Sequence, residues 1–341
     1  MAGAVLIANQ WLTERSGTVV VTADLARGLA RRGWRVAVYA PLMGAVAETL
    51  QAEGAVELVS DIALASFVPD LIHGHQLVPL LAALARFPTA PALQVCHDAV
   101  NWMDAQVPLA RVRTHAAVDF ACRERVCAEL GLAPDETPIL SNALDLGRLP
   151  PRGPLPQRPA RVLIVAHHHG GHVAEVQAAC ERAGLAHETV GTAAGRPVND
   201  LEAWMARADI VVGAARIALE AMAIGCAALV CDARGLAGMA RAADFDAWRG
   251  WNFGRRLLTA PVTAEGVGEA LATYDADDAA ALSARVRAEC GLEPAIDRLE
   301  ALYAEVMAAD RRRGPPEAEA EAALFAATLQ RWLPLDAGLG P

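Results

Sequence analysis

The first half of the chain alternates short apolar runs with amphipathic stretches, and glycine or polar residues separate them. Apolar runs bounded by turn residues predict buried strands, whereas apolar positions three and four residues apart predict helices. The predicted strands are residues 3–9, 34–40, 56–59, 70–75, 92–96, 116–120 and 138–140, and the predicted helices are residues 19–32, 44–53, 78–86 and 122–130. This alternation favours a parallel, doubly wound sheet.

A proline-rich segment interrupts this pattern, which then restarts. Residues 149–159 contain five prolines in eleven positions, which excludes a regular helix or a central strand and is typical of a linker. The strands predicted after it are residues 161–167, 187–190, 210–212 and 227–231, and the helices are residues 173–183, 199–207 and 216–225. The chain is therefore predicted to form two Rossmann-like α/β units in tandem.

The predicted domain limits follow from this division. They are an N-terminal domain over residues 1–148, a linker over 149–159, a C-terminal domain over 160–315 and a last helix over 316–335. The last helix carries apolar residues at helical spacing, namely Leu324, Phe325, Leu329 and Trp332. Two interpretations stay open: the helix packs back on the N-terminal domain, or it packs on its own domain.

Composition and charge exclude several classes of function. A net charge of −10 does not provide the basic surface that nucleic-acid binding requires. The chain contains no lysine, which excludes Schiff-base chemistry and lysine-dependent phosphate loops. Its seven cysteines form no CxxC pair, no apolar run reaches the roughly 18 residues of a membrane span, and the N-terminus lacks a basic leader pattern. We therefore expect a cytoplasmic protein that acts on a small molecule.

Residues 209–225 carry the most informative pattern. The apolar run from Ile210 to Val212 predicts a strand, a small turn follows, and a helix from about Arg216 ends at Gly225. Such a helix begins at the carboxyl edge of the sheet, where ligands bind, and its N-terminus carries about half a positive charge, which suits phosphate. Glu220 lies within this otherwise apolar helix, where a carboxylate is costly without a partner.

The run Glu220-Ala-Met-Ala-Ile-Gly225 resembles the donor-binding segment of family 4 glycosyltransferases, which are retaining enzymes with the GT-B fold. The segment from Leu25 to Val36 is similar to that family's Leu-Ala-x-x-Leu-x-x-x-Gly-His-x-Val. Ser141-Asn-Ala-Leu-Asp145 resembles its Asn-Gly-Val-Asp, with alanine in place of glycine. The resemblance implies that Glu220 binds the ribose of a nucleotide-sugar. The first glutamate of the family's pair, eight residues earlier, is implied to contact the donor sugar, and its position is Val212 here.

Two further runs indicate a divergent subgroup. Ala215-Arg-Ile-Ala-Leu-Glu-Ala221 fits a variant in which a Gly-Arg-x-Ala-Leu-Glu-Ala run replaces the paired glutamates. Asn252-Phe-Gly-Arg255 is similar to runs in some bacterial family 4-like proteins that lack the first glutamate.

The resemblance and the strand ends together predict the donor-side residues. These are Gly17, Thr18, His167, Gly170, Gly171, Gly213, Arg216, Leu219 and Glu220. Relatives neutralise the donor diphosphate with an arginine and a lysine in the loop that is His167-His-His-Gly-Gly-His172 here. Its histidines, its glycine amides or Arg216 are candidates for that role. The alternatives are a metal site in the histidine run, and a salt bridge from Arg216 to a surface acid.

Catalytic and acceptor-side residues are predicted in the first domain. His97 and Asp98 follow a strand and correspond to a histidine that the resemblance places near the transferred sugar. The alternative is a histidine that caps a loop. His73 and His75 share one strand face, but no third ligand for a metal is evident, and no metal site is predicted. The acceptor is expected to meet loops 42–48 and 98–114, with contacts from Trp102, Arg111 and Arg113.

The resemblance thus implies two Rossmann-like domains facing a cleft. It implies a metal-independent, retaining glycosyltransferase that moves a hexosyl-type sugar from a nucleotide-diphosphate sugar without a cofactor. The acceptor stays open between a glycan, a lipid-linked sugar, a protein and a small molecule, as do a peripheral membrane contact and the oligomeric state. Val212 and the missing lysine favour an alternative, a non-catalytic nucleotide-sugar-binding protein or an inactive partner of a transferase. A sugar-nucleotide epimerase, with Asp98 as an acid–base group, is a third class.

Overall fold

The computed structural model describes residues 3–167, 169–198 and 200–336, and the chain divides into two compact units. Unit 1 comprises the residues up to Ser141 together with those from Glu293 onward, and unit 2 comprises Asn142–Leu292. This division differs from the predicted domain limits. The first boundary falls seven residues earlier than residue 148, and residues 293–315 belong to unit 1 and not to unit 2.

Unit 1 is built on a six-stranded sheet with the order β5-β3-β1-β6-β7-β8, and all its neighbouring strands are parallel. The strands are β1 (Ala4–Ala8), β3 (Arg35–Tyr39), β5 (Glu57–Val59), β6 (Leu71–Gly74), β7 (Ala92–Cys96) and β8 (Val112–Ala117). Counted along the chain this is the order 3-2-1-4-5-6 of a Rossmann sheet, whose direction of progression reverses between β1 and β6. Short β2 (Trp11–Leu12) and β4 (Leu42–Met43) pair with each other beside it.

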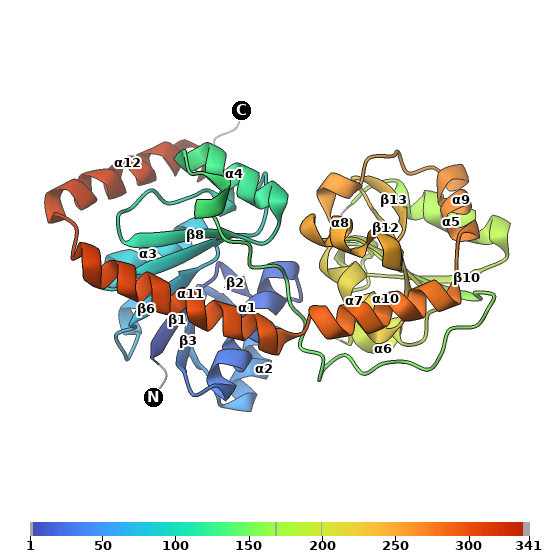
Figure 1. Ribbon diagram of the computed structural model, residues 1–341, viewed down its shortest axis with the longest axis horizontal. Helices are drawn as coiled ribbons and strands as arrows, with labels where there is room; N and C mark the ends of the chain where they lie inside the picture. The colour runs from blue at the N-terminus through green and yellow to red at the C-terminus, as the bar shows by residue number, and fades with distance from the viewer. Residues whose placement is uncertain (1–2, 168, 199, 337–341) are drawn as a thin grey trace. The chain divides into compact units, whose positions relative to one another are not determined.

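Helices cover both faces of this sheet (Figure 1). They are α1 (Gly17–Arg31), α2 (Ala45–Glu53), α3 (Leu77–Arg86), α4 (Phe120–Leu130), α11 (Leu292–Arg313) and α12 (Ala318–Asp336). One face forms a core in which Leu6 and Ile72 of the strands pack against Leu80 and Leu84 of α3. On the other face, Tyr303 of α11 lies against Trp34, with ring centroids 5.4 Å apart.

Unit 2 contains a five-stranded sheet with the order β10-β9-β11-β12-β13. Its strands are β9 (Arg161–Val165), β10 (Ala186–Val190), β11 (Ile210–Gly213), β12 (Ala227–Asp232) and β13 (Gly235–Met239). Its helices are α5 (His172–Ala183), α6 (Leu201–Met205), α7 (Arg216–Ile224), α8 (Phe245–Gly250), α9 (Ala264–Ala272) and α10 (Ala276–Glu289). Both units are therefore doubly wound α/β domains, which confirms the predicted fold class.

Short 3-10 helices lie in the connections of both units. They are η1 (Ile62–Leu64), η2 (Trp102–Asp104), η3 (Pro134–Glu136), η4 (Thr192–Ala194), η5 (Ala242–Asp244) and η6 (Arg255–Leu257).

The glycine-containing segment that follows β12 is a strand. Residues 235–239 form β13, which pairs antiparallel to β12 with a register shift at Val230 and Cys231. Gly235 and Gly238 have φ angles of 155° and 114°, which side-chain-bearing residues rarely adopt, so both glycines serve this hairpin.

Two strand predictions in unit 1 also require correction. The strand expected over 116–120 begins four residues earlier, at Val112, and the one expected over 138–140 is a single bridge between Ala117 and Ile139. Arg113 lies inside β8, and its charge hid the strand from an analysis based on hydrophobicity. The structure buries this charge against the C-terminal helices.

Partly buried polar contacts attach α11 and α12 to the rest of unit 1. Trp34 Nε1 donates to Glu300 at 2.7 Å, and Arg113 Nε donates to Asp310 at 2.8 Å. Arg111 Nε donates to Glu321 of α12 at 2.7 Å, and Phe325 packs against the α3 core. These contacts explain why residues 293–315 belong to unit 1. The sequence did not predict this, because a hydrophobic pattern does not show which sheet an amphipathic helix covers.

Substitution of Arg113 by alanine is expected to destabilise unit 1. The guanidinium side chain is only 4% exposed, and its loss leaves Asp310 and the Gly314 carbonyl without their donor. We expect the free energy of unfolding to fall by about 3 kcal/mol, as for a broken buried pair, in urea denaturation followed by tryptophan fluorescence.

Arg31→Ala is the control, because the exposed Arg31 side chain contacts Glu293 of α11 at 3.4 Å. An exposed pair contributes at most about 1 kcal/mol. Equal losses in the two variants would contradict the assignment of Arg113 as the anchor of α11.

Candidate functional site

The turn between β11 and α7 depends on a glycine. A Cβ atom on Gly213 would lie 2.4 Å from Cγ2 of Ile217 in the first turns of α7. Glycine therefore lets α7 begin directly beside the end of β11, and packing within the turn accounts for Gly213. The helix ends at Gly225, whose φ of 100° is the left-handed cap conformation.

Three residues with positive φ support the start of α7. Ala215 has a φ of 52°, and Asn252 and Phe253 have φ angles of 54° and 50°. The Ala215 amide donates to the Phe253 carbonyl at 2.7 Å, so the strained positions contact one another. Each such residue costs about 1–3 kcal/mol and persists only where surrounding packing holds it. Here the fully buried Phe253 ring lies against Phe245 and Trp248.

Arg216 and Glu220 form a buried ion pair one turn apart in α7. Arg216 Nε donates to Glu220 Oε1 at 2.9 Å, and the two side chains are 8% and 2% exposed. Arg216 Nη1 also donates to the Ala143 carbonyl at 3.1 Å. The carboxylate within the apolar helix thus has its partner. The alternative of a salt bridge from Arg216 is therefore met in part, with a buried acid of the same helix as the partner in this pair.

The remaining donor-side candidates of unit 2 are divided between the core and the sheet edge. Leu219 is fully buried in the core, and its amide donates to the Ala215 carbonyl, so the structure uses it for packing. His167, Gly170 and Gly171 are exposed in the loop that follows β9. This loop and the start of α7 share the carboxyl edge of the parallel strands, where ligands of such sheets bind.

Two loops meet at this edge. A Cβ atom on Gly170 would lie 3.0 Å from the Ala233 Cβ, so the loop after β9 packs closely on the loop after β12. Arg234 in the second loop forms an ion pair with Asp232. His172, the first residue of α5, is buried, and His168 of the predicted histidine run lies outside the described residues. No group of three metal-ligating side chains suited to a metal ion occurs in the part of the chain that the structure describes.

Val212 occupies a core position. It is 1% exposed and lies in β11 between Ile164 of β9 and Leu229 of β12. The family glutamate that the resemblance places here would therefore be buried between two apolar neighbours. Its absence is consistent with the local packing of unit 2.

In unit 1, three histidines converge on one face of the sheet. His75 Nδ1 lies 2.6 Å from His97 Nε2, and His73 Nδ1 lies 2.6 Å from the Tyr303 hydroxyl of α11. Burial lowers the pKa of His73 to about 3 and that of His97 to about 4, and it lowers the pKa of His75 well below its usual value. All three imidazoles are neutral at pH 7, and His97, the only partly exposed member of this trio, ends the chain of contacts.

Two aspartates shape the loop that carries His97. Asp104 Oδ1 accepts the amides of His97 and Asp98 at 2.7 and 3.2 Å, and burial raises the pKa of Asp104 to about 7. Asp98 Oδ1 accepts the amides of Val100 and Asn101, so this carboxylate caps its own loop. The sequence analysis missed Asp104, because nothing in the local pattern shows that its side chain turns back to His97.

The acceptor-side prediction requires correction for its two arginines. The Arg111 guanidinium donates to Glu321 and to the carbonyls of Leu84, Phe87 and Ala90. Together with the binding of Arg113 to Asp310, this leaves both arginines committed to the fold of unit 1. Trp102 is half-buried and packs against the α3 core.

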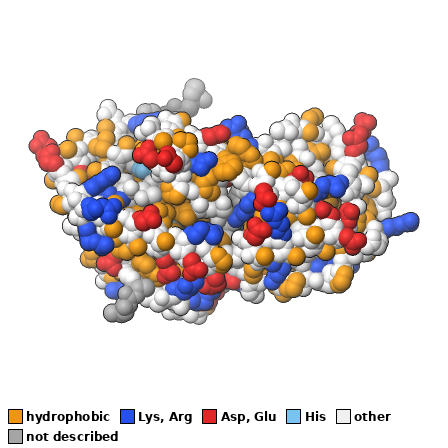
Figure 2. Space-filling view, viewed as in Figure 1, with side chains coloured by type: hydrophobic (Ala, Val, Ile, Leu, Met, Phe, Trp, Pro, Cys, Tyr) orange, Lys and Arg blue, Asp and Glu red, His pale blue; other side chains and the backbone are white. Residues whose placement is uncertain are grey.

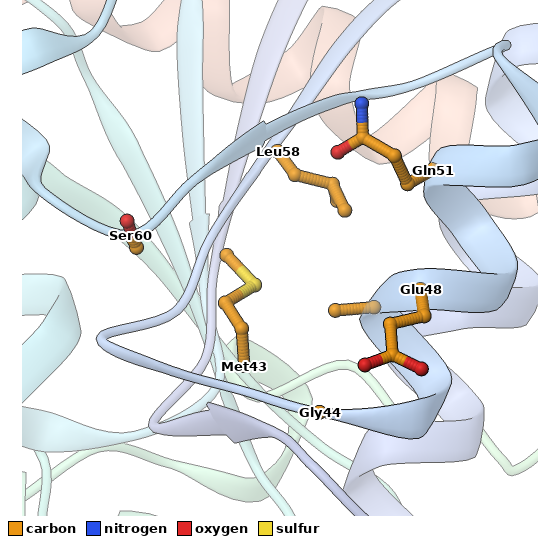
Figure 3. A pocket seen from close by; sticks show the side chains of 7 residues that line it. Met43, Gly44, Glu48, Gln51, Leu58 and Ser60 are labelled. Carbon is orange, nitrogen blue, oxygen red and sulfur yellow. The ribbon is translucent and has the colours of Figure 1, made fainter.

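The first helix and a nearby pocket remain accessible. Gly17 and Thr18 are the first two residues of α1. A Cβ atom on Gly17 would contact no other atom, so packing does not require a glycine there. A pocket of about 290 Å³ lies between α2, β4 and β5, and residues of the predicted acceptor loop 42–48 form part of its lining. Figure 3 shows Met43, Glu48, Gln51 and Leu58 around it.

The face that Figure 2 shows has no extended basic region, because arginines lie among aspartates and glutamates there. Nucleic-acid-binding surfaces concentrate basic side chains on one face. Among the described residues, no helix combines the length and the apolar character needed to cross a bilayer.

The buried histidines predict how stability depends on pH. The pKa of His73 in the folded protein lies below its ordinary value of 6.5. The stability that the buried, neutral His73 contributes is therefore fully present above pH 6.5 and is lost as the pH falls toward 3. We expect the free energy of unfolding to fall by about 2 kcal/mol for this residue between pH 6.5 and pH 5. Urea denaturation of His73→Gln should show a shallower pH dependence, whereas His169→Gln in an exposed loop should match the wild type. Because the raised pKa of Asp104 acts in the opposite direction, the comparison of variants decides: an identical pH dependence in His73→Gln and the wild type would contradict the burial of a neutral imidazole at this position.

Comparison with known proteins gives similarity in structure only. No family model and no curated protein matches the sequence. A glycosyltransferase from Rickettsia africae ESF-5 has a TM-score of 0.60 at 11% identity, over 89% of this chain and 98% of that one. WaaG, a glycosyltransferase involved in lipopolysaccharide biosynthesis, has a TM-score of 0.54 at 14% identity, over 88% and 99%. UDP-N-acetylglucosamine 2-epimerase from Rickettsia bellii has a TM-score of 0.51 at 11% identity, over 91% and 99%. The chain therefore has the GT-B fold, with two Rossmann-like doubly wound domains.

Proposed function

We propose that this chain is a glycosyltransferase that takes its sugar from a nucleotide-diphosphate sugar, and that unit 2 binds the nucleotide. The observation that carries the proposal is the buried Arg216–Glu220 pair in α7. It lies within the run that resembles a donor-binding segment, at the carboxyl edge of the sheet. Solved glycosyltransferases that share the fold over nearly their whole length support the same assignment.

The start of α7 offers the diphosphate a site that needs no metal ion. The helix N-terminus carries a partial positive charge, and the exposed residues Gly170 and Gly171, whose amides are candidate donors, lie on the same sheet edge. The guanidinium of Arg216 is always protonated and donates to oxyanions in a fixed geometry. In this proposal Glu220 accepts hydrogen bonds from the ribose hydroxyls while Arg216 holds its carboxylate in place.

Unit 1 supplies the groups proposed to face the transferred sugar. His97 is neutral, follows β7 at the carboxyl edge and is held by His75 on one side and by Asp104 through its amide on the other. A neutral imidazole is able to donate or accept a hydrogen bond to a sugar hydroxyl. Transfer of a hexosyl group with retention of configuration is part of the proposal, and it rests on the family resemblance.

A second candidate is a nucleotide-sugar-binding protein without transferase activity. The buried Val212 favours it, because the residue that contacts the donor sugar in the family which the sequence resembles has no counterpart at this position. Release of nucleoside diphosphate in the presence of varied acceptors separates the two candidates. Binding without such release would favour the binding protein.

Calorimetry with UDP, GDP, dTDP, ADP and their common sugar conjugates, in the presence of EDTA, tests the donor site. We expect one diphosphate family to bind saturably without metal. Glu220→Gln should weaken that binding by about 1–3 kcal/mol, because buried hydrogen bonds to the ribose are lost.

The control is Glu269→Gln, which changes an exposed carboxylate of α9 in the same unit and should leave binding unchanged. A thermal melt of each variant without ligand separates lost binding from lost folding. Wild-type protein that binds none of these nucleotides would overturn the proposal.

A further inference from the structure

Arg216 belongs to a second set of contacts, which lies where the chain changes units. The chain passes from unit 1 to unit 2 between Ser141 and Asn142 and returns between Leu292 and Glu293. The first three residues of unit 2 are each held by a different partner. Arg249 Nη2 donates to the Asn142 carbonyl, and Arg216 Nη1 donates to the Ala143 carbonyl at 3.1 Å.

The third residue, Leu144, links the segment that enters unit 2 to the segment that leaves it. The Leu144 amide donates to the Cys290 carbonyl at 2.9 Å, and the Leu292 amide donates to the Leu144 carbonyl at 2.9 Å. Both connections between the units therefore meet in a single β-bridge inside unit 2. We call Arg216, Arg249 and the carbonyls of Asn142 and Ala143 the boundary clamp.

The clamp and the start of α7 share their supports. Arg249 lies in α8, and its Nη1 is 3.5 Å from Asn252 Oδ1. Asn252 and Phe253 are the positive-φ residues that follow α8, and the Phe253 carbonyl accepts the amide of Ala215, the residue before Arg216. The loop that contains Asn252 and Phe253 thus holds both arginines in place relative to residues 142–144.

We propose that Arg216 couples a nucleoside diphosphate at the start of α7 to the boundary clamp, an inference that rests on the proposed function. Arg216 Nη1 donates to a neutral carbonyl, whereas a phosphate oxygen is an ionised acceptor and forms a hydrogen bond about twice as strong. A diphosphate therefore competes with Ala143 for this donor. Nε stays on Glu220, and Arg249 continues to hold Asn142.

The coupling requires the geometry of arginine. A guanidinium presents several donors in a planar fork, so it binds Glu220 and Ala143 at once. A lysine ammonium at this position keeps the charge but, as a compact donor on a flexible stem, does not reproduce both contacts. Arg216→Lys thus keeps the positive charge but removes the hydrogen bond to the Ala143 carbonyl.

Hydrogen exchange followed by mass spectrometry, on the full chain, tests this coupling. The peptides that report it contain the Leu144 and Leu292 amides, and the probes are UDP, GDP, dTDP and ADP at saturating concentration. In the wild type we expect the nucleotide that binds to speed exchange in both peptides by about fivefold, which corresponds to the net loss of one hydrogen bond. In Arg216→Lys exchange should already be fast without nucleotide, and nucleotide should not change it.

Two further variants keep the test decisive. Arg249→Lys should raise exchange without nucleotide but retain the response to it, since Arg216 is intact. Arg241→Lys is the matched control, because Arg241 also donates to a backbone carbonyl of unit 2, that of Thr273, but outside the clamp. It should behave like the wild type.

The outcomes separate this inference from the proposed function. Nucleotide binding that leaves exchange in these peptides unchanged, or slows it, overturns the coupling and leaves the donor site standing. An undiminished nucleotide response in Arg216→Lys overturns the role of Arg216. Failure of all four nucleotides to bind the wild type overturns the donor site, and the coupling with it.

Discussion

The buried ion pair between Arg216 and Glu220 is the constraint on which the organisation of unit 2 depends. A carboxylate that is 2% exposed in an apolar helix is stable only beside a cation, and here that cation lies one turn away. The same guanidinium reaches the Ala143 carbonyl and thereby fixes where the chain enters unit 2. The first turn of α7 is therefore both the predicted ligand site and a support for the first residues of unit 2.

Arginine performs a comparable task in unit 1, where it fixes the C-terminal helices. Arg111 and Arg113 bind carbonyl groups and one acid each, from α12 and from α11. In a chain without lysine, every permanently charged basic side chain is a guanidinium, which is more weakly hydrated than an ammonium and satisfies several acceptors at once. This property allows cations to be buried as links between elements far apart in the sequence.

Burial also determines the chemistry of the histidines. The contact between His75 and His97 and the lowered pKa values keep the imidazoles uncharged, so they offer unit 1 hydrogen bonds and no positive charge. The candidate site of unit 2, in contrast, carries its charge on a guanidinium that is already balanced by Glu220. The candidate groups are thus uncharged in unit 1 and form an ion pair in unit 2, although both units have the same type of fold.

The sequence by itself determined the doubly wound α/β class, most strands and the run around Glu220, because hydrophobic periodicity and turn residues act locally. It did not determine that β8 contains Arg113, that residues 235–239 form β13, or that residues 293–315 belong to unit 1. Nor did it show that Arg216 binds Glu220 and Ala143, or that Asp104 holds the loop of His97. These features depend on which distant groups satisfy a buried charge or amide, and only the tertiary structure decides that.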